Sequence, residues 1–244
     1  MTTETTVTTE TTVTTVTTET TVTTRKVRHA RVELALHELR PAAAGLHPLL
    51  LLHGLGERSP TEVPTEVAHW PGPVWALDFT GHGESSVPAG GGYTCELLMA
   101  DVDAAIAEIG PSTIHGRGLG GYVGLLLAGA RPSEVRGLII DDGNGIQGGG
   151  AEPGSQTLDG IARGTVYARA TPDPFAIVEL SGDLRPPDYA ARFARLAVEG
   201  SSLETPIAVV AVTRPHWLAG ILGEYGVVER RIGDAIELFA SAAF

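Results

Sequence analysis

The stretch Ser112-Thr-Ile-His-Gly-Arg-Gly-Leu-Gly-Gly-Tyr-Val-Gly-Leu-Leu-Leu-Ala-Gly-Ala130 joins two apolar segments through a run of glycines. Residues 112–115 have the composition of a strand. Residues 119–130 have the composition of a helix, which Arg131-Pro132 ends. A strand that turns sharply into a helix is a building unit of parallel α/β sheets. The stretch therefore predicts an α/β fold with a tight turn at its centre.

Segments of strand and helix character alternate on both sides of this stretch. Short apolar runs predict strands over residues 48–52, 73–78, 135–140 and 206–212. Residues 95–109 place apolar side chains three and four positions apart, which predicts a helix. Alternating strands and helices predict a mostly parallel sheet flanked by helices.

The chain of 244 residues is long enough for one sizeable core, and 43% of its residues are hydrophobic. Residues 2–24 contain only Thr, Glu and Val, and this composition predicts a disordered Thr-rich tail over residues 1–24. Residues 25–244 are then a single domain. The segment 143–174 is rich in Gly and Pro and predicts a loop-rich lid, which in a longer version extends to residue 200.

Composition also restricts the partners of the chain. The formal net charge of −12 disfavours nucleic-acid binding. Cys95 is the single cysteine, and the first residues lack the pattern of a secretion signal, so we expect a cytoplasmic protein. No apolar run approaches the roughly 20 residues of a membrane helix, so we expect no membrane partner. The sequence indicates no metal and no cofactor, and it leaves the oligomeric state open.

Four motifs in a fixed order carry a family resemblance. They are His53-Gly-Leu-Gly56, Asp78-Phe-Thr-Gly-His-Gly-Glu-Ser85, Gly116-Arg-Gly-Leu-Gly-Gly121 and Leu138-Ile-Ile-Asp-Asp142. Together they resemble the α/β-hydrolase superfamily, chiefly over residues 30–142. In that superfamily the strand-to-helix turn raises a Ser hydroxyl above the sheet, where a His deprotonates it. The resemblance places Gly118 at the nucleophile position, which implies a degenerate member without ordinary serine-esterase chemistry.

The resemblance also implies an oxyanion hole, the pair of amides that binds the reacting oxygen. Its donors would be the backbone amides of Leu55, which follows Gly54, and of Leu119. A helix beginning at Leu119 would add its partial positive charge. Arg117, beside the turn, is a candidate contact for an anionic ligand, and a solvated Arg is the alternative.

The acid and the base have two placements. In the first, Asp183 follows a strand over residues 177–182 as the acid, and His216 follows the last strand as the base. In the second, residues 209–213 are the acid-bearing strand and residues 226–232 contain the last strand, which leaves no catalytic His. Asp142 is a third candidate acid, because some members carry the acid after that strand.

Two functional classes follow from the missing hydroxyl. The first is a pseudo-hydrolase that binds a small carbonyl or carboxylate compound. The second is a non-covalent lyase, isomerase or hydrolase in which His216 with Asp183 or Asp142 acts as acid and base. A lesser alternative is dinucleotide binding, since Gly116-x-Gly118-x-x-Gly121 fits that fingerprint. That fingerprint belongs to the first strand of a domain, however, and at least three predicted strands precede this one.

Overall fold

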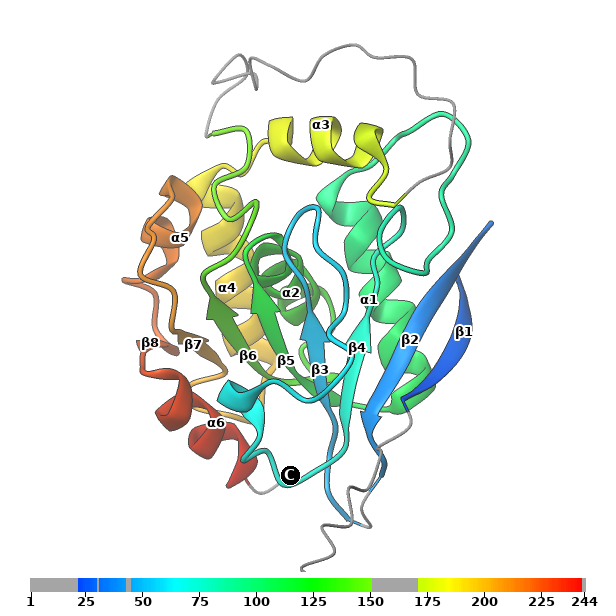
Figure 1. Cartoon of the computed structure of the whole chain (residues 1–244). Helices are drawn as coiled ribbons and strands as arrows, with labels where there is room; N and C mark the ends of the chain where they lie inside the picture. Colours follow the sequence, from blue (N-terminus) through cyan, green and yellow to red (C-terminus); the bar gives the residue numbers. More distant parts are fainter. Residues whose placement is uncertain (1–21, 30, 43–44, 151–170, 243–244) are drawn as a thin grey trace, which may run out of the picture.

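The computed structural model describes residues 22–29, 31–42, 45–150 and 171–242. Its centre is a sheet of eight strands in the order β1-β2-β4-β3-β5-β6-β7-β8 (Figure 1). The strands are β1 (Thr23–His29), β2 (Val32–Arg40), β3 (Leu49–Leu52), β4 (Val74–Leu77), β5 (Ser112–Arg117), β6 (Val135–Asp141), β7 (Ile207–Val209) and β8 (Val227–Glu229). Strand β2 pairs antiparallel with β1 and β4, and all other pairs are parallel. The predicted α/β fold is confirmed.

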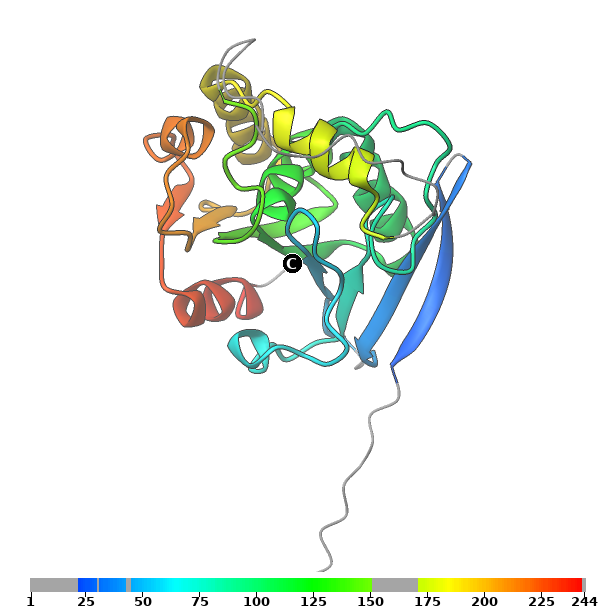
Figure 2. The same ribbon diagram turned by 45° about the horizontal axis from the view of Figure 1, so that its top comes forward.

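Helices cover both faces of the sheet. They are α1 (Cys95–Ile109), α2 (Leu119–Ala130), α3 (Pro174–Gly182), α4 (Pro187–Gly200), α5 (His216–Ile221), α6 (Ile232–Ala240) and the short 3-10 helix η1 (Thr65–Val67). Figure 2 shows α1, α2 and α4 behind the sheet and α6 and η1 in front of it, with α3 near the ends of the parallel strands. The molecule therefore has three layers, and α3 lies near the edge where the parallel strands end.

The central strand β3 explains why the sequence contains four consecutive leucines. Leu50 and Leu52 face the apolar cluster under α1 and α2, whereas Leu49 and Leu51 face the cluster under α6. Side chains alternate between the faces of a strand, so a strand covered on both faces is apolar throughout. All four leucines are buried.

Helix α2 approaches β3 closely at Gly120. A Cβ at this position would lie 2.7 Å from the carbonyl oxygen of Leu52 and 2.9 Å from that of His53. Both contacts are with backbone, which cannot rotate away as a side chain can. Gly120 thus sets the distance at which the start of α2 meets the end of β3.

The tail that the sequence predicted over residues 1–24 extends too far along the chain. Thr23 and Thr24 belong to β1 and pair with Glu38 and His37. Residues 1–21 lie outside the described residues, as do residues 151–170 of the predicted lid. Within the described part, residues 143–150 form a loop after β6, and α4, at the end of the longer lid, packs against α2.

Two buried histidines join the loops that follow β3 and β4. Nδ1 of His53 donates to the Gly54 carbonyl (2.8 Å), and its Nε2 accepts from the Phe79 amide (3.1 Å). Nε2 of His82 accepts from the Gly56 amide (3.2 Å). An imidazole nitrogen that accepts a hydrogen bond carries no proton. Both rings are therefore neutral, and the two loops form one rigid unit beside the elbow, the tight turn at Gly118 that joins β5 to α2.

We predict that acid destabilises this unit. Burial, followed by the neighbouring His82, lowers the pKa of His53 to about 4. This is below the value near 6.5 of an unfolded chain, so the contribution of His53 is complete above about pH 6.5 and is lost as the pH falls to about 4. The loss is on the order of 3 kcal/mol, and urea unfolding at several pH values measures it.

The variant His53→Gln should show a flatter dependence of the unfolding free energy on pH over this range. His69→Gln removes an exposed histidine and serves as the control, which should keep the slope of the parent protein. An unchanged slope in His53→Gln would contradict the assignment.

We also predict opposite effects for two glycine-to-alanine changes in helices. Gly120→Ala should lower the free energy of unfolding by about 1–3 kcal/mol, because its Cβ meets backbone. Gly233 in α6 has open space around a Cβ, so Gly233→Ala should raise it by about 0.5 kcal/mol. Urea denaturation measures both, and equal effects would contradict the packing described for Gly120.

Candidate active site

Strand β5 passes into α2 through Gly118. Its backbone has φ 56° and ψ −116°, a conformation that costs a residue with a side chain on the order of 1–3 kcal/mol. Glycine adopts it freely. The residue is buried, and its amide donates to the Asp141 carbonyl at 3.0 Å. The turn that the sequence predicted is present, with no side chain at its tip.

Two backbone amides next to this turn converge on one oxygen atom. The amide of Leu55, after β3, donates to the Asn144 carbonyl oxygen at 2.9 Å. The amide of Leu119, the first residue of α2, donates to the same oxygen at 3.0 Å. These are the two donors expected for an oxyanion hole. The Asn144 carbonyl oxygen thus accepts from both of the amides that the family resemblance implies as donors.

The loop of residues 143–146, which we call the plug loop, also fills the space of a nucleophile. A Cβ built on Gly118 would lie 2.2 Å from the Asn144 oxygen and 2.5 Å from the Gly143 carbonyl carbon. A Cβ on Gly54 would lie 2.9 Å from the Asn144 nitrogen. The plug loop can take this position only because glycines face it.

The plug loop was not among the site residues that the sequence predicted. Residues 143–148 appear in the sequence as Gly-Asn-Gly-Ile-Gln-Gly, a pattern typical of a loop. Nothing in that pattern indicates which amides the loop would meet, because Leu55 and Leu119 are far away in the chain. The glycine at position 118 was the one available signal, since it leaves room for a close backbone contact.

Arg117 at the end of β5 is exposed and pairs with Glu57. Its Nη1 donates to Oε2 of Glu57 at 3.1 Å, and the Gly54 amide donates to the same oxygen at 3.1 Å. The guanidinium is exposed to solvent and is held beside the elbow by a carboxylate, and its contact with an anionic ligand stays a prediction.

The candidate acids hold backbone segments. Asp142 accepts hydrogen bonds from the amides of Val212 (2.7 Å) and Thr213 (3.0 Å). Burial raises the pKa of Asp142, but these amides outweigh it and keep the pKa below the usual value. Asp183 follows α3 and accepts from the Cys95 amide at 2.9 Å. Each carboxylate thus fixes a neighbouring loop.

The candidate base lies apart from these acids. Residues 177–182 belong to α3, and β7 and β8 are the last two strands, so the second of the two placements is the one observed. His216 is the first residue of α5, between β7 and β8, and is exposed. Among the described residues, no hydrogen bond or ion pair joins His216 to Asp142 or Asp183. After β8 come Arg230 and Arg231 instead of a histidine.

The dinucleotide alternative finds no support at this turn. The turn follows β5, a central strand with four strands before it in the chain. The amides of Gly118 and Leu119, which would face a pyrophosphate, already donate to carbonyls of the chain itself. In the described ranges, no group of three or more candidate ligands could hold a metal ion. The helices within those ranges are too short or too polar to cross a membrane.

We predict that a hydroxyl placed at position 118 does not confer hydrolysis. Gly118→Ser should lose about 2 kcal/mol of unfolding free energy, because its Cβ meets the plug loop in a strained conformation. It should hydrolyse p-nitrophenyl esters no faster than the parent protein. Gly118→Ala adds the same Cβ without the hydroxyl and should lose as much stability. Faster hydrolysis by the Ser variant than by both others would show that a base is in place.

Comparison with solved structures identifies the same architecture in known hydrolases. A hydrolase from Pseudomonas aeruginosa PA01 aligns with a TM-score of 0.57 and 20% identity, over 92% of this chain and 100% of that one. The thioesterase domain from the curacin biosynthetic pathway aligns with a TM-score of 0.56 and 16% identity, over 90% and 98%. At sequence identities this low, the similarity shows a shared fold and nothing about activity.

Other matched structures are longer than this chain. The aligned part spans 45% of the length of a structure from Acinetobacter baumannii and 43% of VinJ. No curated protein sequence matches the chain.

The family comparison covers most of the domain. The sequence profile described as the Alpha/beta hydrolase family matches residues 49–238, from the start of β3 into α6. This range includes the elbow, the hole and the plug loop. The chain therefore belongs to the alpha/beta hydrolase family.

Proposed function

We propose that the elbow site binds a small carboxylate compound and does not hydrolyse it. One observation carries the proposal: the amides of Leu55 and Leu119 converge on the Asn144 carbonyl oxygen at 2.9 and 3.0 Å. The hole is thus formed, and an oxygen atom fits it. A ligand would bind by exchanging its own oxygen for that of Asn144.

The absence of hydrolysis at this site follows from three features. Gly118 has no side chain to attack a carbonyl. The residues after β8 are Arg230 and Arg231 rather than a histidine, and a guanidinium offers hydrogen-bond donors but no acceptor. The carboxylate of Asp142 is engaged by backbone amides. The remaining groups can bind a ligand, but they supply neither a nucleophile nor a base.

The competition with Asn144 favours a charged ligand. A neutral carbonyl ligand would form the same kind of hydrogen bonds as the Asn144 carbonyl that it displaces. It would therefore gain no hydrogen-bond strength, and the Asn144 carbonyl, being part of the chain, is always close by to compete. A carboxylate forms hydrogen bonds roughly twice as strong with the same amides. It also gains from the partial positive charge at the start of α2, a helix of 12 residues. We therefore assign a carboxylate rather than a ketone or an amide.

Within the plug loop, residues 145 and 146 are anchored by buried side chains, whereas Asn144 is exposed. Arg185 donates to the carbonyls of Gly145 and Ile146, and Nε1 of Trp217 donates to Ile146 at 2.7 Å. Arg185 and Trp217 are both buried. Asn144 is exposed, and its carbonyl is released when the bonds to the two amides break. We infer that exchange moves residues 143 and 144 while residues 145 and 146 stay in place.

The acid–base alternative has no specific observation in its favour. It requires a histidine held by a carboxylate over the elbow, and the geometry of His216 described above does not supply one. His216→Gln is therefore useful as a control for the binding experiment.

The test monitors the backbone amides of Leu55 and Leu119 by NMR. In ¹⁵N-labelled protein, butyrate should shift the amide resonances of Leu55 and Leu119 together and saturably. Butyramide, which has the same shape without the charge, should shift them far less. The amide of Ser112, which is bonded to Glu134 at the start of β5, should stay in place.

His216→Gln should give the same titration as the parent protein. The proposal is wrong if butyrate leaves both amides unmoved, or if butyramide binds equally well. A titration that disappears in His216→Gln would favour the acid–base alternative.

A further inference from the structure

A cavity of about 510 Å³ lies between the first two strands and the loops after β3 and β4. Its walls include Thr24 and His37 from β1 and β2, Arg58 and Ser59 from the loop after β3, and Asp78 at the end of β4. The only helix between β3 and β4 in the described residues is η1, which packs against α6. Because η1 does not cover the face of β1 and β2 that carries Thr24 and His37, this face is open and forms one wall of the cavity.

Three side chains on this wall form a continuous chain of hydrogen bonds. The Thr24 hydroxyl lies 2.9 Å from Nδ1 of His37, and Nε2 of His37 lies 3.0 Å from Oδ2 of Asp78. Thr24 and His37 are direct partners in the β1–β2 register, so their side chains project from the same face of the sheet. His37 and Asp78 are buried, whereas Thr24 is exposed.

The surroundings of Asp78 determine where the protons lie. Its carboxylate also accepts from the amides of Ser59 and Glu84, each at 2.7 Å. Burial raises the pKa of Asp78, but the hydrogen bonds from His37, Glu84 and Ser59 outweigh it and hold the pKa well below the usual range. The carboxylate is therefore ionised, and Nε2 of His37 must carry the proton that it donates.

In the neutral form of His37, this proton placement makes the other nitrogen an acceptor. In neutral imidazole one nitrogen carries the proton and the other has a free lone pair. With the proton on Nε2, Nδ1 accepts the hydrogen bond of the Thr24 hydroxyl. A hydroxyl, a base and a carboxylate that orients the base are the parts of an activated nucleophile.

We propose that Thr24, His37 and Asp78 form a second catalytic centre, which cleaves small carboxylic esters that carry an additional anionic group. Thr24 is the nucleophile and His37 is the general base. Asp78 is a positioning residue, because it acts through His37. The cavity is large enough for a small ester.

The proposed reaction has two steps. The Thr24 oxygen attacks the ester carbonyl carbon while its proton passes to Nδ1 of His37. The bond to the alcohol oxygen then breaks, and the alcohol leaves with that proton. Water, deprotonated by the same nitrogen, attacks the acyl-threonine; the bond to the Thr24 oxygen breaks, that oxygen takes the proton back from Nδ1, and the acid is released. No oxidant or metal is needed, and His37 returns to its starting state.

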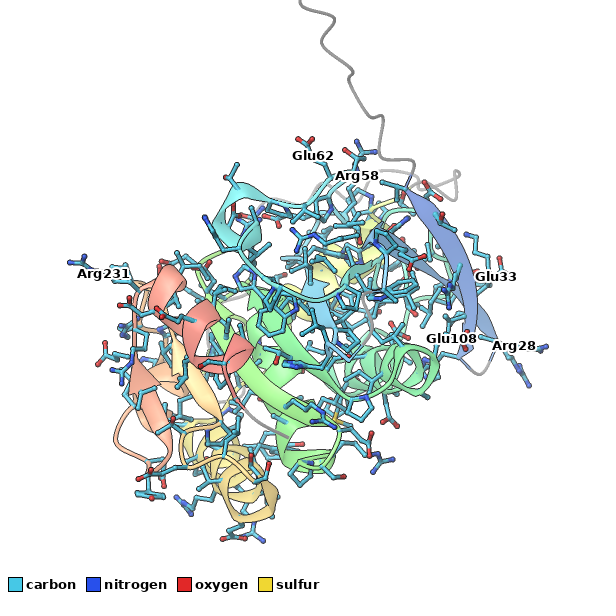
Figure 3. All side chains as sticks on the ribbon, turned by 90° about the horizontal axis from the view of Figure 1, so that it is seen from below. Arg28, Glu33, Arg58, Glu62, Glu108 and Arg231 are labelled. Atoms are coloured by element: carbon cyan, nitrogen blue, oxygen red, sulfur yellow. The ribbon has the colours of Figure 1, made fainter. Side chains whose placement is uncertain are left out.

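Arg58 supplies the preference for an anion. Its side chain lines the cavity and is exposed, and Figure 3 shows it projecting from the surface near Glu62. It forms no hydrogen bond or ion pair with the described residues. A guanidinium binds a carboxylate through two parallel hydrogen bonds. We assign to Arg58 the anionic group of the ester.

The experiment compares two esters, p-nitrophenyl acetate and the mono-p-nitrophenyl ester of succinic acid. The parent protein should hydrolyse the succinyl ester faster, with an initial burst equal to the protein concentration if deacylation is slower than acylation. Thr24→Val and His37→Gln should each lose at least about 100-fold in rate. Thr23→Val changes the neighbouring exposed residue and should keep the rate within about twofold. Arg58→Gln should lower the succinyl rate and leave the acetyl rate unchanged.

Two further readouts separate catalysis from folding. Mass spectrometry of the protein quenched during turnover should place the acyl group on Thr24. Long-range ¹H–¹⁵N NMR should find the proton of His37 on Nε2, and Asp78→Asn should alter that assignment in protein that remains folded by circular dichroism.

The proposal is wrong if the parent protein hydrolyses neither ester, if Thr24→Val keeps the rate, or if the acyl group is found elsewhere. Because Gly118 and the plug loop take no part, these outcomes do not depend on the proposed binding at the elbow.

Discussion

The Asn144 carbonyl oxygen ties together the loops that follow three neighbouring strands. Leu55 follows β3, Leu119 follows β5 and Asn144 follows β6, and these strands lie side by side in the sheet. The contact exists only because Gly118 has no Cβ, since a Cβ there would lie 2.2 Å from the oxygen. The turn without a side chain at Gly118 and the hydrogen bonds of Leu55 and Leu119 to Asn144 are thus one structural feature. A buried amide without a partner costs about 1–3 kcal/mol, so filling the hole also stabilises the elbow.

The groups around this contact differ in how firmly they are held. On the β3 and β4 side, His53 and His82 bond the two loops to each other from buried positions. On the β6 side, the plug loop reaches the elbow through the exposed residue Asn144, which lies between two anchored parts of the chain, Asp142 before it and residues 145 and 146 after it. A ligand would therefore meet a fixed pair of donors and a carbonyl that can leave. A binding site in which a group of the protein competes with the ligand needs fixed donors and a competing group that can move away.

The sequence predicts those parts of the site that depend on neighbours in the chain. The glycine-rich turn around Gly118 is local, so both its position and its missing side chain are readable. The acid and base were ambiguous because β7 and β8 have only three residues each, too few to show a period, while the apolar residues of α3 resemble a strand. The role of Asn144 could not be predicted, because it depends on the fold bringing distant loops together. His37 was overlooked for the same reason, since its partner Thr24 lies at the end of a Thr-rich repeat that predicts disorder.

The elbow and the cavity at β1 and β2 are bordered by the same loop, since Leu55 bonds to Asn144 while Gly56 and Glu57 line the cavity. Asp78 accepts from Ser59, Glu84 and His37, and none of these residues bonds to the plug loop. The hydrogen bonds of the plug loop to other described elements involve Leu55, Leu119, Arg185 and Trp217. Groups without shared partners respond to change almost additively. Movement of Asn144 therefore leaves the Thr24–His37–Asp78 chain intact, because the neutral histidines keep the loop between the two sites rigid.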